Sequence, residues 1–150
     1  IISRCQIVRF RSFSSDQMCS ILKDNLDLSE FNINKKLKPE DLIKSANGSP
    51  GQLLKNIEIW NELSDEITRK LDSPLKNSLE ILEVSKLISE RLEIYQQIFL
   101  VNLIQIIWWR KTKNVGLIKK LEKLKYLLRK NIQTRLAWEI TFLNISLEIK

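Results

Sequence analysis

The amino-acid sequence predicts an all-α protein built as two consecutive helical bundles. Apolar residues recur three and four positions apart along most of the chain, as one buried helix face requires. Helix start signals, in which Ser is followed within two positions by Pro or Asp, occur at Ser14, Ser49 and Ser73. Near residues 64–73 the composition changes from short helical segments to longer and more apolar ones. We therefore expect two bundles and negligible strand content.

The first bundle is predicted from three short helices. One follows the cap residues at 14–17, a second spans about 39–47 and begins with proline, and a third spans about 49–63. Gly48 supplies a left-handed residue that ends the second helix. The segment 5–10, upstream of these helices, is rich in β-forming residues and is expected to be extended.

The second bundle is predicted to start after Ser73-Pro74. A long apolar periodicity follows, which consists of Leu75, Leu79, Leu82, Leu87, Leu92, Tyr95 and Phe99. The segment 94–109 carries no charge, so a membrane helix has to be considered. It is only about 16 residues long, against roughly 20 needed to span a bilayer, and it contains four amide side chains. We interpret it as a buried core helix.

Two further helical patterns complete the second bundle. Gly116 is expected to break the helix before it, and the patterns then cover about 117–130 and 134–149. The last one places four apolar residues on one stripe: Leu136, Ile140, Leu143 and Leu147.

Composition limits the chemistry that this chain can perform. It contains no His, so Ser–His and Cys–His catalysis are excluded, and its two cysteines cannot supply a four-ligand Cys/His zinc site. Its three glycines do not form a phosphate-binding P-loop. We therefore expect no cofactor and no enzymatic activity in this chain alone. Two lone cysteines also fit a reducing, cytoplasmic location, although their number alone would also allow a single disulfide between them.

The chain is basic, with a formal net charge of +7 and a pI near 9.5. Such a balance suits nucleic acid or an acidic protein surface, but it is equally typical of a solvated helical surface. Helical spacing is expected to scatter the basic residues around the helix axis, which favours a solvated face over a DNA site. The basic run consists of Lys111, Lys113, Lys119, Lys120, Lys123, Lys125, Arg129 and Lys130.

The amino end carries the first motif, Ser3-Arg4-Cys5, ahead of the extended segment and the first bundle. The chain starts without Met and without a signal-peptide core, so we expect further sequence upstream. The motif resembles the Ser-Arg-Cys motif of clamp-loader AAA+ ATPases. The resemblance implies that Arg4 is an arginine finger acting in trans on ATP bound by a neighbouring subunit, with Ser3 and Cys5 supporting it. A planar, permanently charged guanidinium suits that role, because it can hold phosphate oxygens bidentately.

A second motif, at residues 45–54, resembles the sensor-2 turn of the AAA+ lid. ATP-hydrolysing members of the family usually read Gly-Ser-x-Arg there, and the arginine contacts the subunit's own nucleotide. This chain has Gly51 at the matching position. The departure is typical of the delta-prime branch of the family and implies that the subunit does not hydrolyse ATP by itself.

The third stretch, 100–143, is similar to clamp-loader collar domains, which end in an Asn-x-x-x-Arg-Leu-Ala pattern like the one at 131–137. The resemblance spans almost the whole chain, most specifically at 3–10 and 46–54, and is thin at 23–40. It implies four parts: the end of a nucleotide-binding domain at 1–11, a three-helix lid at 12–63, a linker at 64–72 and a collar at 73–150.

The resemblance implies a subunit of the DNA polymerase III clamp loader, which loads the sliding clamp on primed DNA. Its partners would be the gamma/tau and delta subunits, bound through the collar, with clamp and DNA as partners of the complex and no membrane. We expect Trp108, Trp109 or Trp138 to lie near or under that contact. Two alternatives stay open: a gamma/tau-like subunit that hydrolyses ATP, and an unrelated helical interaction domain.

Overall fold

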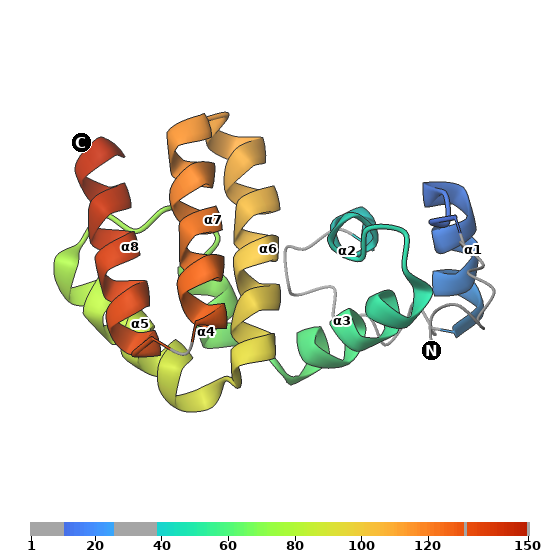
Figure 1. Ribbon diagram of the computed structural model, residues 1–150, viewed down its shortest axis with the longest axis horizontal. Coiled ribbons are helices and arrows are strands. Elements are labelled where there is room, and N and C mark those ends of the chain that lie inside the picture. Colours follow the sequence, from blue (N-terminus) through green and yellow to red (C-terminus); the bar gives the residue numbers. More distant parts are fainter. Residues whose placement is uncertain (1–10, 26–38, 131, 150) are drawn as a thin grey trace, which may run out of the picture.

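The computed structural model describes residues 11–25, 39–130 and 132–149, and in these ranges the ordered elements are helices, with no strand (Figure 1). The predicted all-α fold is confirmed. The segment 5–10, with the motif before it, lies outside the described residues. The helices are α1 Ser15–Asn25, α2 Pro39–Ser45, α3 Pro50–Glu62, α4 Asp65–Lys70, α5 Ser78–Arg91, α6 Ile94–Thr112, α7 Val115–Arg129 and α8 Thr134–Ile149.

Helices α1 to α3 form the first bundle, and each of the three contacts the other two. In Figure 1 they lie at one end of the molecule, and α2 faces α6 of the second bundle. Their apolar faces are buried against one another, since moving such side chains out of water stabilises the fold. The buried residues include Met18, Leu22, Leu42, Leu53, Ile57 and Trp60.

Helices α4 to α8 form the second bundle. Helices α6, α7 and α8 lie side by side, and α5 packs against α8 (Figure 1). Trp108, Trp138 and Phe142 are fully buried at its centre, and the Phe142 ring lies 5.9 Å from that of Trp108 and 5.1 Å from that of Trp138. Both indole nitrogens have partners: Trp108 Nε1 donates to the carbonyl of Leu71 at 2.8 Å, and Trp138 Nε1 donates to Gln97 Oε1 at 2.8 Å.

The prediction that 94–109 is a core helix is confirmed by burial along α6. Its buried residues include Phe99, Leu100, Val101, Leu103 and Ile104. Within the described ranges, no helix has both the length and the apolar character needed to cross a membrane.

The segment 64–72, which was predicted as a linker, contains helix α4. Ser64 caps it by accepting a hydrogen bond from the backbone of Ile67, whose side chain is 1% exposed. Leu63 and Leu71 on either side are also buried, so the apolar core continues through this segment. This helix was not predicted, because most of its residues are charged or polar. That the segment links the two parts stays a prediction. The outer limits of the lid and collar stay a prediction.

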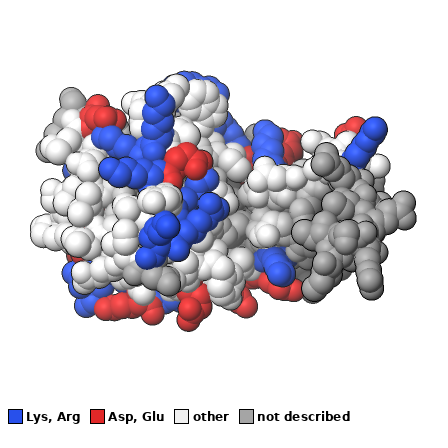
Figure 2. Space-filling view, in the orientation of Figure 1, with Lys and Arg blue, Asp and Glu red and all other residues white. Residues whose placement is uncertain are grey.

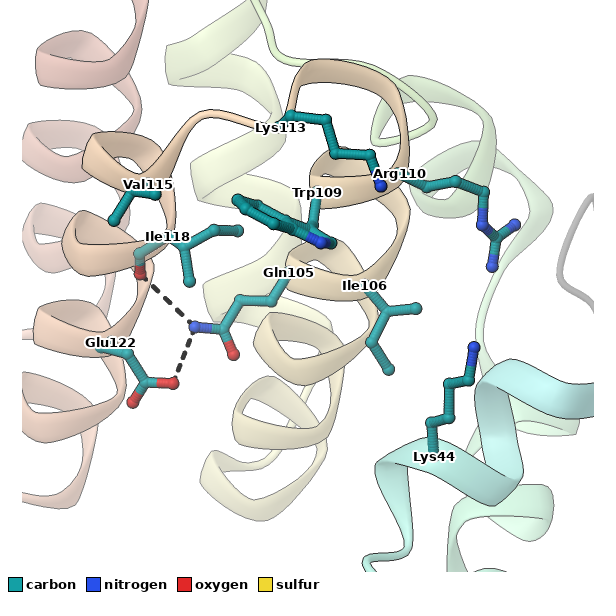
Figure 3. Close-up of a pocket in the computed structure, with 9 residues that line it drawn as sticks. All are labelled: Lys44, Gln105, Ile106, Trp109, Arg110, Lys113, Val115, Ile118 and Glu122. Atoms are coloured by element: carbon teal, nitrogen blue, oxygen red, sulfur yellow. Dashed lines mark hydrogen bonds between the residues drawn. The ribbon is translucent and has the colours of Figure 1, made fainter. Parts of the chain in front are cut away.

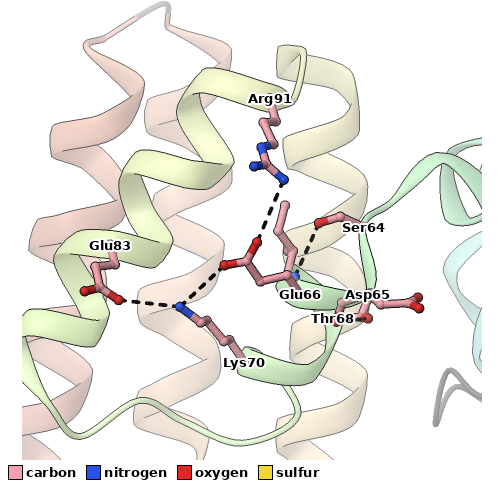
Figure 4. A network of polar contacts seen from close by, with 8 residues as sticks. Ser64, Asp65, Glu66, Thr68, Lys70, Glu83 and Arg91 are labelled. Atoms are coloured by element: carbon pink, nitrogen blue, oxygen red, sulfur yellow. Dashed lines mark hydrogen bonds and ion pairs between the residues drawn. The ribbon is translucent and has the colours of Figure 1, made fainter.

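A small network of exposed charges connects α4 with α5 (Figure 4). Lys70 Nζ lies 3.7 Å from Glu66 Oε1 and 3.5 Å from Glu83 Oε2, and Arg91 lies 3.8 Å from Glu66. Exposed pairs of this kind contribute little stability each, so the buried side chains of α4 hold it in place.

The break between α6 and α7 is made by Lys113 and Asn114, and the prediction that Gly116 makes it was wrong. Lys113 has a φ of 52°, in the left-handed region. The Asn114 side chain then accepts a hydrogen bond from the backbone of Leu117 at 3.2 Å, so α7 already starts at Val115. Gly116 lies in the first turn of α7, where a helix tolerates glycine.

The apolar stripe predicted along α8 lies mostly outside the core. Leu136, Ile140 and Leu147 are exposed, and only Leu143 is partly buried. Two hydroxyls on the inner face, those of Thr141 and Ser146, are satisfied by their own helix, because they donate to the carbonyls of Ala137 and Leu143 at 2.8 Å. The inner face can therefore be buried although it is less apolar. It consists of Ala137, Trp138, Thr141, Phe142, Ile145 and Ser146.

Part of the apolar series at the start of the second bundle also lies outside the core. Leu79 and Leu82 of α5 are exposed, as is Tyr95 at the start of α6. The buried face of α5 consists of Ile81, Val84, Ser85 and Ile88.

Candidate functional site

Of the sequence-predicted site, the structure describes the turn at residues 45–54. The candidate finger Arg4 and its neighbours Ser3 and Cys5 lie outside the described residues, so their roles stay predictions. The turn joins α2 to α3 and has two successive left-handed residues, Asn47 with φ 49° and Gly48 with φ 74°.

Gly48 is where the start of the described chain contacts this turn. The backbone N–H of Phe13 donates to the Gly48 carbonyl at 2.9 Å. A Cβ atom at Gly48 would lie 2.7 Å from Ser12 Cβ and 2.8 Å from the Phe13 carbonyl oxygen. Both the positive φ and this close approach require glycine. The turn therefore holds the start of the described chain at Ser12 and Phe13.

A chain of side-chain hydrogen bonds between α2 and α3 stabilises the turn. The Ser45 hydroxyl donates to the Leu42 carbonyl at 2.7 Å, and Asn56 Nδ2 donates to Ser45 Oγ at 2.8 Å. Gln52 Nε2 in turn donates to Asn56 Oδ1 at 2.8 Å. Because buried polar groups are costly when unpaired, this chain of bonds ties α2 to α3 in one arrangement.

Gly51, at the sensor-2 position, is exposed in the first turn of α3. A Cβ atom there would meet nothing within 4 Å, so space does not require glycine. Ser49 Oγ caps the helix by accepting from the backbone N–H of Gln52 at 3.4 Å. The turn thus has the helix start expected of a sensor-2 element, without a cationic side chain at its centre.

The two bundles meet where α2 contacts α6. The guanidinium of Arg110 donates to the carboxylate of Asp41, which is fully buried. At the other end of α6, Gln96 Nε2 donates to Glu62 Oε2 of α3 at 3.0 Å. Polar contacts at both ends of α6 therefore set how the first bundle sits on the second.

Beside this joint lies an open cavity of about 630 Å³ (Figure 3). Trp109 covers its α6 side, and Gln105 Nε2 crosses to α7, donating to Glu122 Oε1 at 2.9 Å and to the Ile118 carbonyl at 3.5 Å. The cavity is apolar with charges on its rim. Its lining residues are Lys44, Gln105, Ile106, Trp109, Arg110, Lys113, Val115, Ile118 and Glu122.

The rim carboxylate, Glu122, is held ionised. Partial burial acts to raise its pKa, but hydrogen bonds from Lys125 and Gln105, with the charges of Lys125 and Arg129, lower the pKa below the ordinary value of 4.5. Its charge is offset by Lys125 Nζ at 2.7 Å.

The three tryptophans that were predicted near a subunit contact do not share one environment. Trp108 and Trp138 are fully buried within this chain, whereas Trp109 is 41% exposed and reaches the surface at the cavity. That one of them lies near or under a subunit contact stays a prediction. Large hydrophobic side chains are also exposed on the outer side of α8, at Leu136, Ile140 and Leu147.

The expected scatter of the basic run is also only partly right. Lys120 and Lys125 turn inward to partners, Lys120 to Glu148 at 2.7 Å and Lys125 to Glu122. Lys119, Lys123 and Lys130 are exposed, and their spacing of four and seven residues places them on one side of α7. Figure 2 shows Lys and Arg side chains gathered over this part of the molecule.

Two features of the site were missed by the sequence analysis. The contact between Asp41 and Arg110 joins residues far apart in sequence, and no local pattern indicates it. By contrast, each of two exposed aromatic rings is followed four positions later by a lysine, Trp109 by Lys113 and Tyr126 by Lys130. That spacing could have been recognised in the sequence.

Comparison with known proteins identifies the family. No curated protein and no solved structure matches the chain. Residues 16–145, which include every helix but the first residue of α1 and the end of α8, match the family described as "Cyanobacterial DNA polymerase III delta prime, C-terminal domain". The chain therefore belongs to this family, and with it to the clamp-loader subunits of DNA polymerase III.

Proposed function

We propose that this chain is the lid and collar of a subunit that helps to load the sliding clamp on primed DNA, and that it joins the other loader subunits through the outer face of α8. The α8 outer face is defined here as Leu136, Ile140, Leu143 and Leu147. The family match supports the loader assignment, and this face supports the mode of assembly. The unrelated helical domain considered above is excluded by the match.

The α8 outer face carries the proposal because it is apolar and open to solvent. Leu136, Ile140 and Leu147 are 44%, 48% and 69% exposed. Their spacing along the helix places them in one stripe, and their exposure leaves a continuous apolar strip on a helix that has already buried its other side. Contiguous apolar surface of this kind is typical of a protein contact. The partners we propose are the collars of the gamma/tau and delta subunits.

The test is co-elution of the chain with purified loader subunits in size-exclusion chromatography. Leu136→Lys and Leu147→Lys should each abolish or strongly reduce co-elution, because each places a charge in an apolar contact. Leu54→Lys is the matched control, since Leu54 is exposed on α3, far from α8, and should leave co-elution unchanged. All three variants should keep the unfolding temperature of the wild type within a few degrees.

Two results would contradict this mode of assembly. One is failure of the wild-type chain to co-elute at both low and moderate salt. The other is co-elution of the two α8 variants to the same extent as Leu54→Lys.

We further propose that Arg4 acts in trans on ATP bound by a neighbouring subunit, with Ser3 and Cys5 positioning it. The glycine at the sensor-2 position supports this division of labour, because it leaves the chain without the arginine that hydrolysing relatives use in cis. The same observation disfavours the gamma/tau-like alternative. A cytoplasmic location also stays a prediction.

A further inference from the structure

Two exposed aromatic rings lie at opposite ends of α7, each with a lysine over it. At the turn before α7, Lys113 Nζ lies 5.4 Å from the centroid of the Trp109 ring. Near the end of α7, Lys130 Nζ lies 5.7 Å from the centroid of the Tyr126 ring, which is 60% exposed. A helix of 15 residues is about 22 Å long, so the two ring and lysine pairs are on the order of 20 Å apart.

Lys119 and Lys123 lie between these two pairs. With about 100° of rotation per residue, Lys119, Lys123, Tyr126 and Lys130 fall within an arc of roughly 60° on α7. All four are exposed. The structure gives none of the three lysines an ion pair with another described residue, so their charges remain available. The α7 face is defined here as Trp109, Lys113, Lys119, Lys123, Tyr126 and Lys130.

The carboxylate of α7, that of Glu122, does not cancel the charge of the α7 face. Glu122 accepts hydrogen bonds from Gln105 and Lys125, and the Lys125 ammonium lies 2.7 Å away. This pair is nearly neutral as a unit. Figure 2 shows the resulting surface, in which basic side chains over α6 and α7 surround a small acidic area.

We propose that the α7 face binds single-stranded DNA, with the lysines on phosphates and the Trp109 and Tyr126 rings stacked on bases. Cations that track a phosphate chain, together with aromatic rings on which unpaired bases stack, are the two elements of single-strand recognition. A duplex keeps its bases stacked internally and would leave both rings unused. An acidic protein would satisfy the lysines and not the rings. The choice of DNA as the nucleic acid rests on the proposed function.

The experiment is fluorescence anisotropy of a labelled oligothymidylate of about 20 nucleotides, titrated with the 150-residue chain at several salt concentrations. The wild type should bind, and its affinity should fall as salt rises. K119Q/K123Q should bind more weakly and should reduce the slope of log K against log salt by about 1.4, since each phosphate contact on a single strand contributes about 0.7. Tyr126→Ala and Trp109→Ala should each weaken binding by about five-fold or more, and Tyr126→Phe should not.

The matched control is K55Q/K76Q, which removes the same charge from two exposed lysines on other parts of the chain. It should reduce binding far less than K119Q/K123Q. Circular dichroism and the unfolding temperature should be unchanged in all of these variants, because none of the substituted side chains is buried.

Three outcomes would overturn the proposal: no binding by the wild type at low salt, equal losses in K55Q/K76Q and K119Q/K123Q, or duplex DNA binding as tightly as the oligothymidylate with Tyr126→Ala neutral. The last pattern, or equally tight binding of polyglutamate, would indicate simple attraction to polyanions. If the loader function is wrong but this proposal is right, the chain will not co-elute with loader subunits, whereas K119Q/K123Q will still lower DNA binding.

Discussion

The guanidinium of Arg110, at the end of α6, forms an ion pair with the carboxylate of Asp41 in α2. The Asp41 side chain is 1% exposed and that of Arg110 is 42% exposed. A buried carboxylate needs a partner charge, since removal from water costs several kcal/mol for each ion. The contact between the two bundles therefore depends on this ion pair as well as on apolar packing.

Arg110→Ala should destabilise the chain by about 3 kcal/mol, because it leaves the Asp41 charge buried without this partner. The additional substitution Asp41→Asn should recover part of that loss, which gives a favourable coupling energy in a double-mutant cycle. Urea unfolding followed by circular dichroism measures both. Arg91→Ala is the control, since the Arg91 pair with Glu66 is exposed on both sides and should be worth less than about 1 kcal/mol. Equal losses in the two variants would contradict a structural role for the buried pair.

The two glycines of the α2–α3 turn should respond in opposite directions to alanine. Gly48→Ala should destabilise the chain by more than 1 kcal/mol, because it combines a positive φ with a Cβ 2.7 Å from Ser12 Cβ. Gly51→Ala should stabilise it by about 0.5 to 1 kcal/mol, because a helical glycine in open space is replaced by a better helix former. Thermal unfolding of both variants tests this pair, and a loss at Gly51 would show that its flexibility is needed.

The Glu122 carboxylate should make stability depend on pH in the acid range. Its pKa is lowered in the folded chain from the ordinary 4.5, despite partial burial, by Lys125 and Gln105. A lowered pKa means that the folded state binds the proton less tightly than the unfolded state, so this contribution is present above pH 4.5 and is lost as pH falls through the lowered value. Glu122→Gln should flatten the decrease in unfolding temperature between about pH 5 and about pH 3. Lys125→Gln should flatten it in part, and an unchanged profile in both variants would contradict the assignment.

Helix starts were predictable because their chemistry is local. Ser14 and Gln17 cap α1 reciprocally, with Gln17 Oε1 accepting from Ser14 N at 2.9 Å, and Ser49 and Pro50 start α3 as expected. A cap involves residues within one turn, so it can be recognised in sequence. Helix α4 escaped the same reasoning because it is short, and because its charged residues concealed one buried side chain, that of Ile67.

Helix faces were less predictable, since they depend on neighbours far away in sequence. Helix α8 carries apolar residues on both its inner and its outer side, with polar residues such as Arg135, Glu139 and Asn144 between them. The structure buries Trp138 and Phe142, whose rings pack against each other, and leaves Leu147 outside. When both sides of a helix carry apolar residues, its sequence gives little signal of which side the bundle covers.

The candidate site likewise contains features that could be predicted from the sequence and features that could not. The turn around Gly48 was predicted, because a left-handed residue followed by a cap and a proline has few other uses. The scatter predicted for the basic run was only partly right, because Lys119, Lys123 and Lys130 share one side of α7 whereas Lys120 and Lys125 pair elsewhere. The contact of Asp41 with Arg110 required the tertiary structure, because nothing near either residue indicates the other.

The prediction for Arg4 concerns a neighbour's active site. If the catalytic arginine is absent in cis, at Gly51, and present in trans, at Arg4, its loss should affect hydrolysis by the assembled loader and leave assembly intact. Arginine fingers contribute roughly 10³ to 10⁵ in rate in related phosphoryl transfers. Arg4→Ala in the subunit that carries this sequence should therefore reduce DNA-stimulated ATPase of the loader strongly, by less than this factor because other ATP sites remain.

Steady-state ATPase and clamp loading on primed DNA would be measured with complexes reconstituted from wild-type or Arg4→Ala subunit, and gel filtration would establish equal assembly. Arg11→Ala is the matched control, because Arg11 is an exposed arginine seven positions along the same end of the chain. Arg4→Lys should remain impaired, since an ammonium retains the charge but not the planar fork that holds two phosphate oxygens. If properly assembled Arg4→Ala complexes hydrolyse ATP and load clamps like the wild type, Arg4 is not a finger. If Arg4→Lys restores full activity, a positive charge suffices and the bidentate role is wrong.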